Sequence, residues 1–124
     1  MTPISFSSGP VFHRQGVTFV GLTSPSRGSR ENAVWRFTLP AGAPGHPHSL
    51  TREETFVALE GTARIEVNGV AHAFAAGDAI AVPAGARLCL SNPGQAAFEA
   101  LAVLPVGARV LVEGMEPFVP PWAA

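Results

Sequence analysis

The sequence predicts an all-β protein, a sandwich or closed barrel of short strands, with a jelly roll as the favoured form. Thirteen glycines and twelve prolines are spread along the 124 residues and divide the chain into segments too short for long helices. The segments between them are rich in β-branched, aromatic and aliphatic residues, and turn signals separate them at regular intervals. A chain of this length, with 47% hydrophobic residues, is expected to form one domain with its own core.

The strands are expected in a regular series along the chain. They span residues 16–22, 33–39, 54–60, 63–67, 70–74, 79–83, 87–91 and 97–104. On the third of these strands Glu54 and Phe56 share one face, whereas Glu53 just before it has the opposite parity and is expected in solvent. Trp35, Phe37 and Leu39 share one face of the second strand, which predicts core or pocket wall.

The clearest turn is Asn68-Gly69, which suits the two positive-φ positions of a type I′ hairpin. This turn predicts three cross-strand pairs that share one face, namely Val67 with Val70, Ile65 with His72, and Ala63 with Phe74. His72 is therefore expected as a core histidine with one nitrogen hydrogen-bonded.

Both ends of the chain are expected to be extended. Residues 1–15 read as an N-terminal arm, and the proline-rich segment 116–124 reads as an extended tail. Phe118 and Trp122 are expected to anchor this tail, either on its own barrel or on a partner subunit.

Charge and hydropathy exclude several classes of function. The net charge is −1, and the eight basic residues, all arginine, are scattered without a cluster, so no nucleic-acid surface is predicted. No apolar run is long enough for a membrane helix, and no signal peptide is evident, so a cytoplasmic protein is expected. In the polar loop 23–32, Arg27 and Arg30 could steer an anionic ligand or simply be solvated.

Two stretches carry spaced motifs: "GAPGHPHSLTREETFVALEG" at 42–61 and "GDAIAVPAGARLCLSN" at 77–92. In the spacing of their glycines, proline, glutamate and asparagine they resemble the two motifs of the cupin family. The family's first motif has His-x-His and a later glutamate, and its second has a further histidine. The resemblance covers residues 42–92 and implies a cupin jelly-roll barrel, or double-stranded β-helix, for a single domain 1–124.

The first motif fits the family in two registers. Taking His46 and His48 as the histidine pair requires a deletion on one side and an insertion on the other. A register that begins at His48 requires neither, and all of its fixed points fit: Gly42, His48, Leu50, Glu54 and Gly61.

The second register changes the chemistry that the family implies. Cupins hold a metal with three histidines and one glutamate, and the matching positions here are His48, Leu50, Glu54 and Leu88. A leucine offers a metal no lone pair, so the resemblance implies a site that has lost its metal. The first register keeps an alternative open, in which His46, His48 and Glu54 form a 2-His-1-carboxylate site for a divalent transition metal such as Fe, Mn, Ni or Zn.

Two classes of function follow. In the first, the protein binds a small molecule in a largely apolar pocket lined by His48, Leu50, Glu54, Phe56 and Leu88. In the second it is an enzyme, either a metal-free isomerase or lyase with His48 and Glu54 as an acid–base pair, or a metal-dependent oxygenase that also uses His46. The family also implies a homodimer.

Cys89 is the chain's single cysteine and forms no internal disulfide. It is expected to be a small buried residue on the face opposite Leu88. Arg87, which precedes Leu88, is also expected to point away from the cavity.

Overall fold

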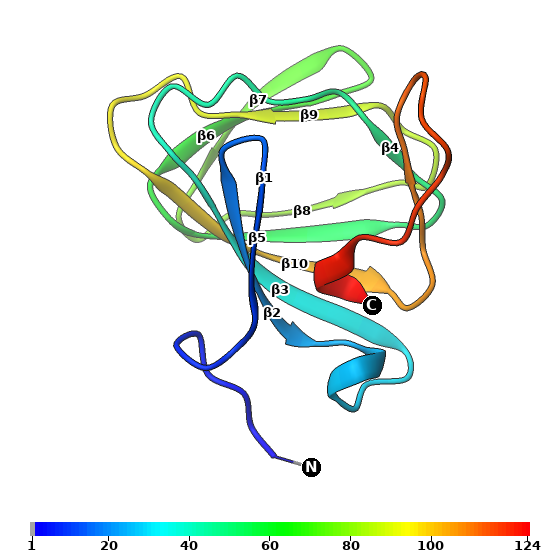
Figure 1. The fold of residues 1–124 in the computed structure, drawn as a ribbon. Coiled ribbons are helices and arrows are strands. Elements are labelled where there is room, and N and C mark those ends of the chain that lie inside the picture. The colour runs from blue at the N-terminus through cyan, green and yellow to red at the C-terminus, as the bar shows by residue number, and fades with distance from the viewer. Residues whose placement is uncertain (1) are drawn as a thin grey trace.

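The structure is a computed structural model that describes residues 2–124, and it consists almost entirely of strands (Figure 1). The strands are β1 (Val11–Arg14), β2 (Val17–Thr23), β3 (Asn32–Leu39), β4 (Ser49–Leu50), β5 (Glu54–Glu60), β6 (Thr62–Val67), β7 (Val70–Ala75), β8 (Ala79–Val82), β9 (Leu88–Ser91), β10 (Phe98–Pro105) and β11 (Val110–Leu111). Two short 3₁₀ helices, η1 (Pro25–Arg27) and η2 (Pro121–Ala123), complete the described part. No helix within residues 2–124 is long and apolar enough to cross a membrane.

The strands form a barrel from two facing sheets. One sheet has the order β1-β2-β3-β10-β5-β8, and the other has the order β7-β6-β9, with every pairing antiparallel. The short pair β4–β11 joins the second sheet through a bridge between His48 and Leu88. The all-β jelly-roll prediction is confirmed, and all eight predicted strands are present.

The core is built by strict alternation and by pairing small residues with large ones. On β10, Phe98, Ala100, Ala102 and Leu104 face inward and are at most 1% exposed. Ala100 lies opposite Phe37 of β3, and Ala102 lies opposite Trp35 on one side and Phe56 of β5 on the other. The alanines therefore leave space on the central strand for aromatic rings from both neighbouring strands. Aromatic rings pack against one another across the core in the pairs Phe37–Phe56, Phe37–Phe98 and Phe74–Phe98.

The predicted hairpin is confirmed, but its histidine is not in the core. Asn68 and Gly69 have φ of 50° and 81°, and Ile65 pairs with His72. Ile65 is fully buried because β6 is flanked by β7 and β9. His72 is exposed because β7 is an edge strand whose outer half no other element covers, so the prediction of a core histidine is wrong.

The N-terminal segment contains a strand that the sequence analysis missed. Within the predicted arm, whose first residue lies outside the described part, Val11–Arg14 pairs with β2 as the edge of the larger sheet. The connecting residues Gln15 and Gly16 have φ of 51° and 80°, which is the geometry of a second type I′ turn. Cross-strand pairing puts Phe12, Arg14, Val17 and Phe19 on one face of this hairpin.

The C-terminal tail returns to its own barrel. The indole of Trp122 stacks on Phe19 of β2, with ring centroids 3.6 Å apart and planes 3° from parallel. Arg27 in the 23–32 loop donates from Nε to the Leu22 carbonyl and from Nη2 to the Trp122 carbonyl, both at 3.0 Å. Arg27 is thus not merely solvated, because these bonds tie the loop to the tail, and a role in steering a ligand stays a prediction. The homodimer stays a prediction.

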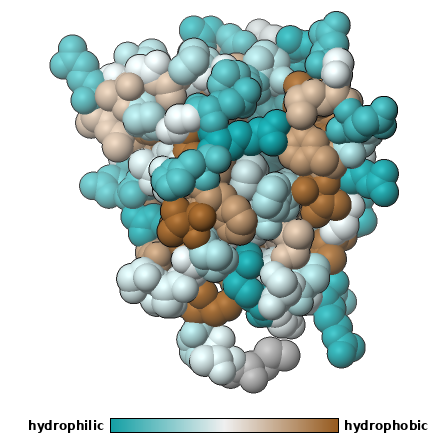
Figure 2. Space-filling model, viewed as in Figure 1, coloured by the Kyte–Doolittle hydropathy of each residue, from teal (hydrophilic) through white to brown (hydrophobic). Residues whose placement is uncertain are grey.

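The outer surface is mixed in polarity. On the face seen in Figure 2, hydrophobic side chains gather in small groups that hydrophilic ones interrupt. Arg87 and Glu53 are exposed as predicted, whereas Cys89 is half-buried, not enclosed as expected. Its neighbours on β9, Leu88 and Leu90, face inward instead.

Candidate functional site

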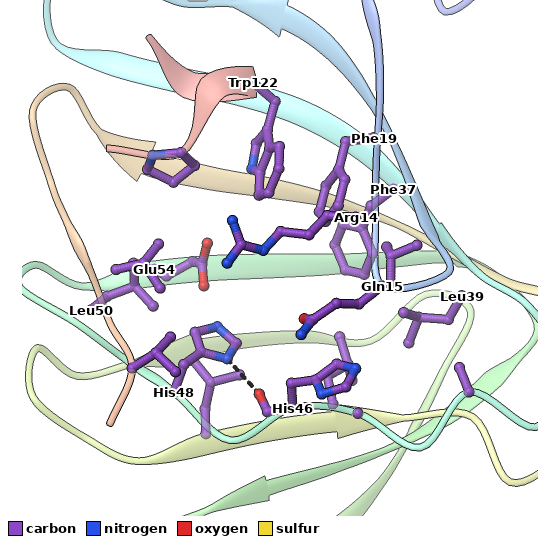
Figure 3. A pocket seen from close by; sticks show the side chains of 18 of the residues that line it. Arg14, Gln15, Phe19, Phe37, Leu39, His46, His48, Leu50, Glu54 and Trp122 are labelled. Carbon is purple, nitrogen blue, oxygen red and sulfur yellow. Dashed lines mark hydrogen bonds between the residues drawn. The ribbon is translucent and has the colours of Figure 1, made fainter. Parts of the chain in front are cut away.

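A cavity of about 170 Å³ lies inside the barrel between the two sheets (Figure 3). Its wall is mainly aromatic and aliphatic. The apolar lining comprises Val17, Phe19, Trp35, Phe37, Leu39, Leu50, Phe56, Leu88, Leu90, Val110, Val112, Phe118 and Trp122. The three β3 residues predicted as core or pocket wall serve as both, because they are at most 4% exposed and also face the cavity.

All five residues predicted for the ligand pocket line this one cavity. They are His48, Leu50, Glu54, Phe56 and Leu88. His48 and Leu88 exchange backbone hydrogen bonds of 3.0 and 2.8 Å, so the start of the first motif lies directly against the second. Their roles in binding stay predictions, but their common location follows from two-residue alternation on neighbouring strands.

Glu54 is the first residue of β5 and the most deeply buried ionisable group of the cavity. Its side chain is 4% exposed, and it forms no hydrogen bond or ion pair with any residue of the described chain. Removal from water penalises the charged carboxylate and raises the pKa of Glu54 from 4.5 to about 8. At neutral pH the group is therefore a carboxylic acid, with one O–H to donate and a carbonyl oxygen that accepts.

His48 presents a single nitrogen to the cavity. Its Nδ1 lies 2.8 Å from the carbonyl oxygen of His46, which can only accept, so Nδ1 carries the proton. Burial lowers the pKa of His48, although the hydrogen bond to His46 opposes the shift. In the neutral ring Nε2 is then a lone-pair acceptor.

Neither Glu54 nor His48 shifts the pKa of the other. Burial alone raises the pKa of Glu54, and the charge that acts on the pKa of His48 is that of His46. No hydrogen bond joins Glu54 to His48 among residues 2–124. The two groups are thus independently neutralised by the apolar cavity instead of forming an ion pair.

The polar residues around the cavity do not fit a resident metal ion. Within the described chain no three histidine, cysteine, aspartate or glutamate side chains are grouped closely enough to bind one. His46, the third member of the alternative triad, is exposed, and its backbone carbonyl is occupied by His48. Leu50 and Leu88, 3% and 1% exposed, fill the wall with hydrocarbon.

Sequence analysis did not place the two ends of the chain at the cavity, although it expected Phe118 and Trp122 to anchor the tail on the barrel or on a partner subunit. Arg14 and Gln15 come from the β1–β2 turn, and Phe118 and Trp122 come from the tail. The signal for the turn was present, since Gln15-Gly16 separates two alternating segments. The tail could not be placed, because nothing local specifies which surface a proline-rich segment covers.

Trp122 brings a second unpartnered polar group to the wall. Its Nε1–H is buried and has no acceptor among the described residues. A buried donor left without a partner costs about 1–3 kcal/mol. Trp122 and Glu54 are thus two polar groups of the cavity that the described chain leaves without a hydrogen-bond partner, whereas Nδ1 of His48 is paired.

Comparison with known proteins agrees with this architecture. The family model for the cupin domain matches residues 35–104. The chain belongs to the cupin domain family. No curated protein sequence matches it significantly.

Several solved structures share the fold at low sequence identity. The polyketide cyclase RemF from Streptomyces resistomycificus is 18% identical with a TM-score of 0.81, over 94% of this chain and 87% of that one. An RmlC-like cupin from Shewanella frigidimarina is 17% identical with a TM-score of 0.74, over 85% of this chain and 90% of that one. KdgF from Halomonas sp. is 13% identical with a TM-score of 0.72, over 84% of this chain and 94% of that one. At these identities the similarity establishes the fold.

The burial of Glu54 predicts an unusual dependence of stability on pH. Between the unfolded pKa of 4.5 and the folded pKa of about 8, the folded state keeps a proton that the unfolded state has lost. Stability therefore falls as pH rises through this window, by up to about 1.4 kcal/mol per pH unit. Glu54→Gln removes the effect. In urea unfolding from pH 5 to 9, the free energy of unfolding of the variant is expected to rise relative to that of the wild type as pH rises. If the two free energies changed with pH in parallel, the raised pKa of Glu54 would be contradicted.

Proposed function

We propose that this cupin binds a small, largely apolar molecule inside its barrel, with Glu54 and His48 as polar contacts at neutral pH. The observation that carries the proposal is the apolar cavity whose buried carboxyl has no partner in the described chain. A cavity of about 170 Å³ compares with the roughly 150 Å³ that accommodates a benzene ring in a protein core. A one- or two-ring body is therefore the size that we expect.

The neutral state of the cavity favours an uncharged polar group on the buried end of this ligand. The acid of Glu54 would donate to a carbonyl or hydroxyl oxygen, and Nε2 of His48 would accept from a hydroxyl or N–H. A ligand that pairs both groups would relieve their burial without introducing a charge.

A neutral aromatic probe tests this function. Wild-type protein is expected to bind 2-naphthamide with a Kd below about 1 mM by isothermal titration calorimetry. Both tryptophans of the chain line the cavity, so quenching of intrinsic fluorescence gives a second readout. Val112 is half-buried and lines the cavity, so the larger side chain of Val112→Phe should narrow it. This variant is expected to bind 2-naphthamide at least roughly tenfold more weakly.

Leu111→Phe is the matched control, because Leu111 adjoins Val112 in the sequence but is exposed and does not line the cavity. It should bind 2-naphthamide as the wild type does. No detectable binding to the wild type, or equal binding by both phenylalanine variants, would reject the proposed site.

We also propose that Leu50 and Leu88 occupy two of the positions where other cupins hold their metal. The supporting geometry is the bridge between His48 and Leu88 and the shared cavity of all four side chains, Glu54 included. Leucine at both positions replaces metal-binding side chains with apolar wall, which suits the apolar body of a small molecule better than a metal ion.

Restoring the two histidines tests this interpretation. Leu50→His/Leu88→His is expected to bind Co²⁺ at least roughly a hundredfold more tightly than the wild type, with the visible absorption of a protein-coordinated ion. Leu50→His/Leu90→His is the control, since Leu90 also lines the cavity but lies two residues along β9. Equal Co²⁺ affinity in the two double variants would refute the positions assigned here.

A second candidate is metal-free acid–base catalysis, favoured by the pKa of about 8 at Glu54. At pH 7 the pair would act with Nε2 of His48 as proton acceptor and the acid of Glu54 as hydrogen-bond donor to a carbonyl oxygen. The polyketide cyclase that shares the fold is an enzyme, but at 18% identity its activity enters only as a possibility for this chain.

Enolisation of a two-ring ketone tests the second candidate. The protein is expected to accelerate α-deuteration of 2-tetralone in D₂O, followed by NMR, and the rate should fall above about pH 8 as Glu54 ionises. Glu54→Gln should be slower and lack that fall while still binding 2-naphthamide. A wild-type rate equal to that of buffer would leave binding as the function.

A further inference from the structure

Arg14 is the one lysine or arginine among the residues that line the cavity. It occupies the last inward position of β1 before the Gln15-Gly16 turn, on the same hairpin face as Phe12 and Phe19. Its partly exposed side chain extends from the hairpin toward the side chains of Glu54, His48 and Trp122, which also line the cavity (Figure 3).

The guanidinium of Arg14 is held in place but its donors are almost unused. Its Cζ lies 4.8 Å from the ring centroid of Phe118, and Nη2 is 3.9 Å from the sulfur of Met115. Both contacts come from the C-terminal segment and hold the guanidinium against it. No oxygen within residues 2–124 accepts a hydrogen bond from it.

The other partly buried arginines of the described chain have oxygen partners. Arg36 donates to Glu99 at 2.6 Å, and Arg27 donates to two backbone carbonyls at 3.0 Å. The ion pairs found in residues 2–124 are Arg36–Glu99 and Arg64–Glu66, so no carboxylate neutralises Arg14. A half-buried cation beside an apolar wall, without a counter-charge, is a site for an anion from outside the protein.

The remaining groups of the cavity do not compete for this role. Glu54 is buried as a neutral acid at pH 7, and His48 is a neutral ring that presents a lone pair. The polarity of the cavity thus changes from uncharged inside to cationic at its opening. A molecule that matches this pattern has an apolar, aromatic or alicyclic body and one anionic group at the outer end.

We propose that Arg14 is a specificity-determining residue that binds the carboxylate of a one- or two-ring ligand whose apolar body fills the barrel. The planar guanidinium can donate two parallel hydrogen bonds to the two oxygens of a carboxylate. The contact of its Cζ with the Phe118 ring restricts the side chain before the ligand arrives, which reduces the entropy lost on binding. The proposal rests on the proposed binding function and names the ligand class of the same cavity.

Two probes that differ only in charge test this inference. 2-Naphthoate and 2-naphthamide have the same ring system, but only the first has a carboxylate. Calorimetric titration at pH 7 should show that wild-type protein binds the naphthoate more tightly by roughly tenfold to a hundredfold, as a charged hydrogen-bonded pair implies. Raising the salt concentration should reduce this preference without changing the affinity for the amide.

Substitutions at two arginines separate the specific contact from a general charge effect. Arg14→Gln should remove the preference while leaving the affinity for 2-naphthamide within about twofold of the wild type, which also shows that the variant is folded. Arg14→Lys keeps the charge without the fork and should retain only part of the preference. Arg30→Gln removes one charge from the exposed loop, at a residue that does not line the cavity, and should behave as the wild type.

The possible outcomes separate this inference from the function on which it depends. Equal affinity of the wild type for both probes, or a preference that survives in Arg14→Gln, would overturn the role of Arg14 and leave the apolar binding function intact. A preference lost equally in Arg30→Gln would also overturn it, because long-range charge would then suffice. Failure of the wild type to bind either probe would reject the binding function itself.

Discussion

The burial of one carboxyl group without a partner in the described chain determines the chemistry of this cupin cavity. Glu54 begins a strand whose alternation turns it inward among leucine and aromatic side chains. An apolar surrounding cannot solvate a carboxylate, so the group keeps its proton up to about pH 8. His48 loses charge for the same reason. The barrel thereby holds two polar groups near neutral pH and no net charge from either.

This arrangement differs from the cation-binding centre that cupins hold with three histidines and one glutamate. A metal needs several lone pairs that converge on one point, and the energy of coordination must exceed the cost of taking an ion out of water. The described chain supplies no such convergence, and Leu50 and Leu88 add hydrocarbon to the wall that Glu54 and His48 also line. Charge returns only at the opening, where Arg14 lies across the ring of Phe118.

Local sequence patterns failed to predict burial and pairing where these depend on which strands lie beside one another in the sheet. His72 and Ile65 have the same parity and pair directly, yet one is exposed and the other fully buried. The difference arises because β6 is an interior strand and β7 is an edge, which no pattern within the hairpin reveals. Likewise, Val11–Arg14 is a strand of four residues, and although the turn signal of Gln15-Gly16 follows it, only its pairing with β2 makes it the edge of the sheet.

The sequence by itself determined the positions of the eight main strands, the Asn68-Gly69 hairpin and the common inward face of His48, Leu50, Glu54 and Leu88. These follow from two-residue alternation and from motif spacing, both of which are properties of short segments. Only the tertiary structure decided the protonation of Glu54 and the meeting of Arg14 with Phe118 and of Phe19 with Trp122. Desolvation and contacts between opposite ends of a chain arise from packing of the whole barrel, so no local pattern encodes them.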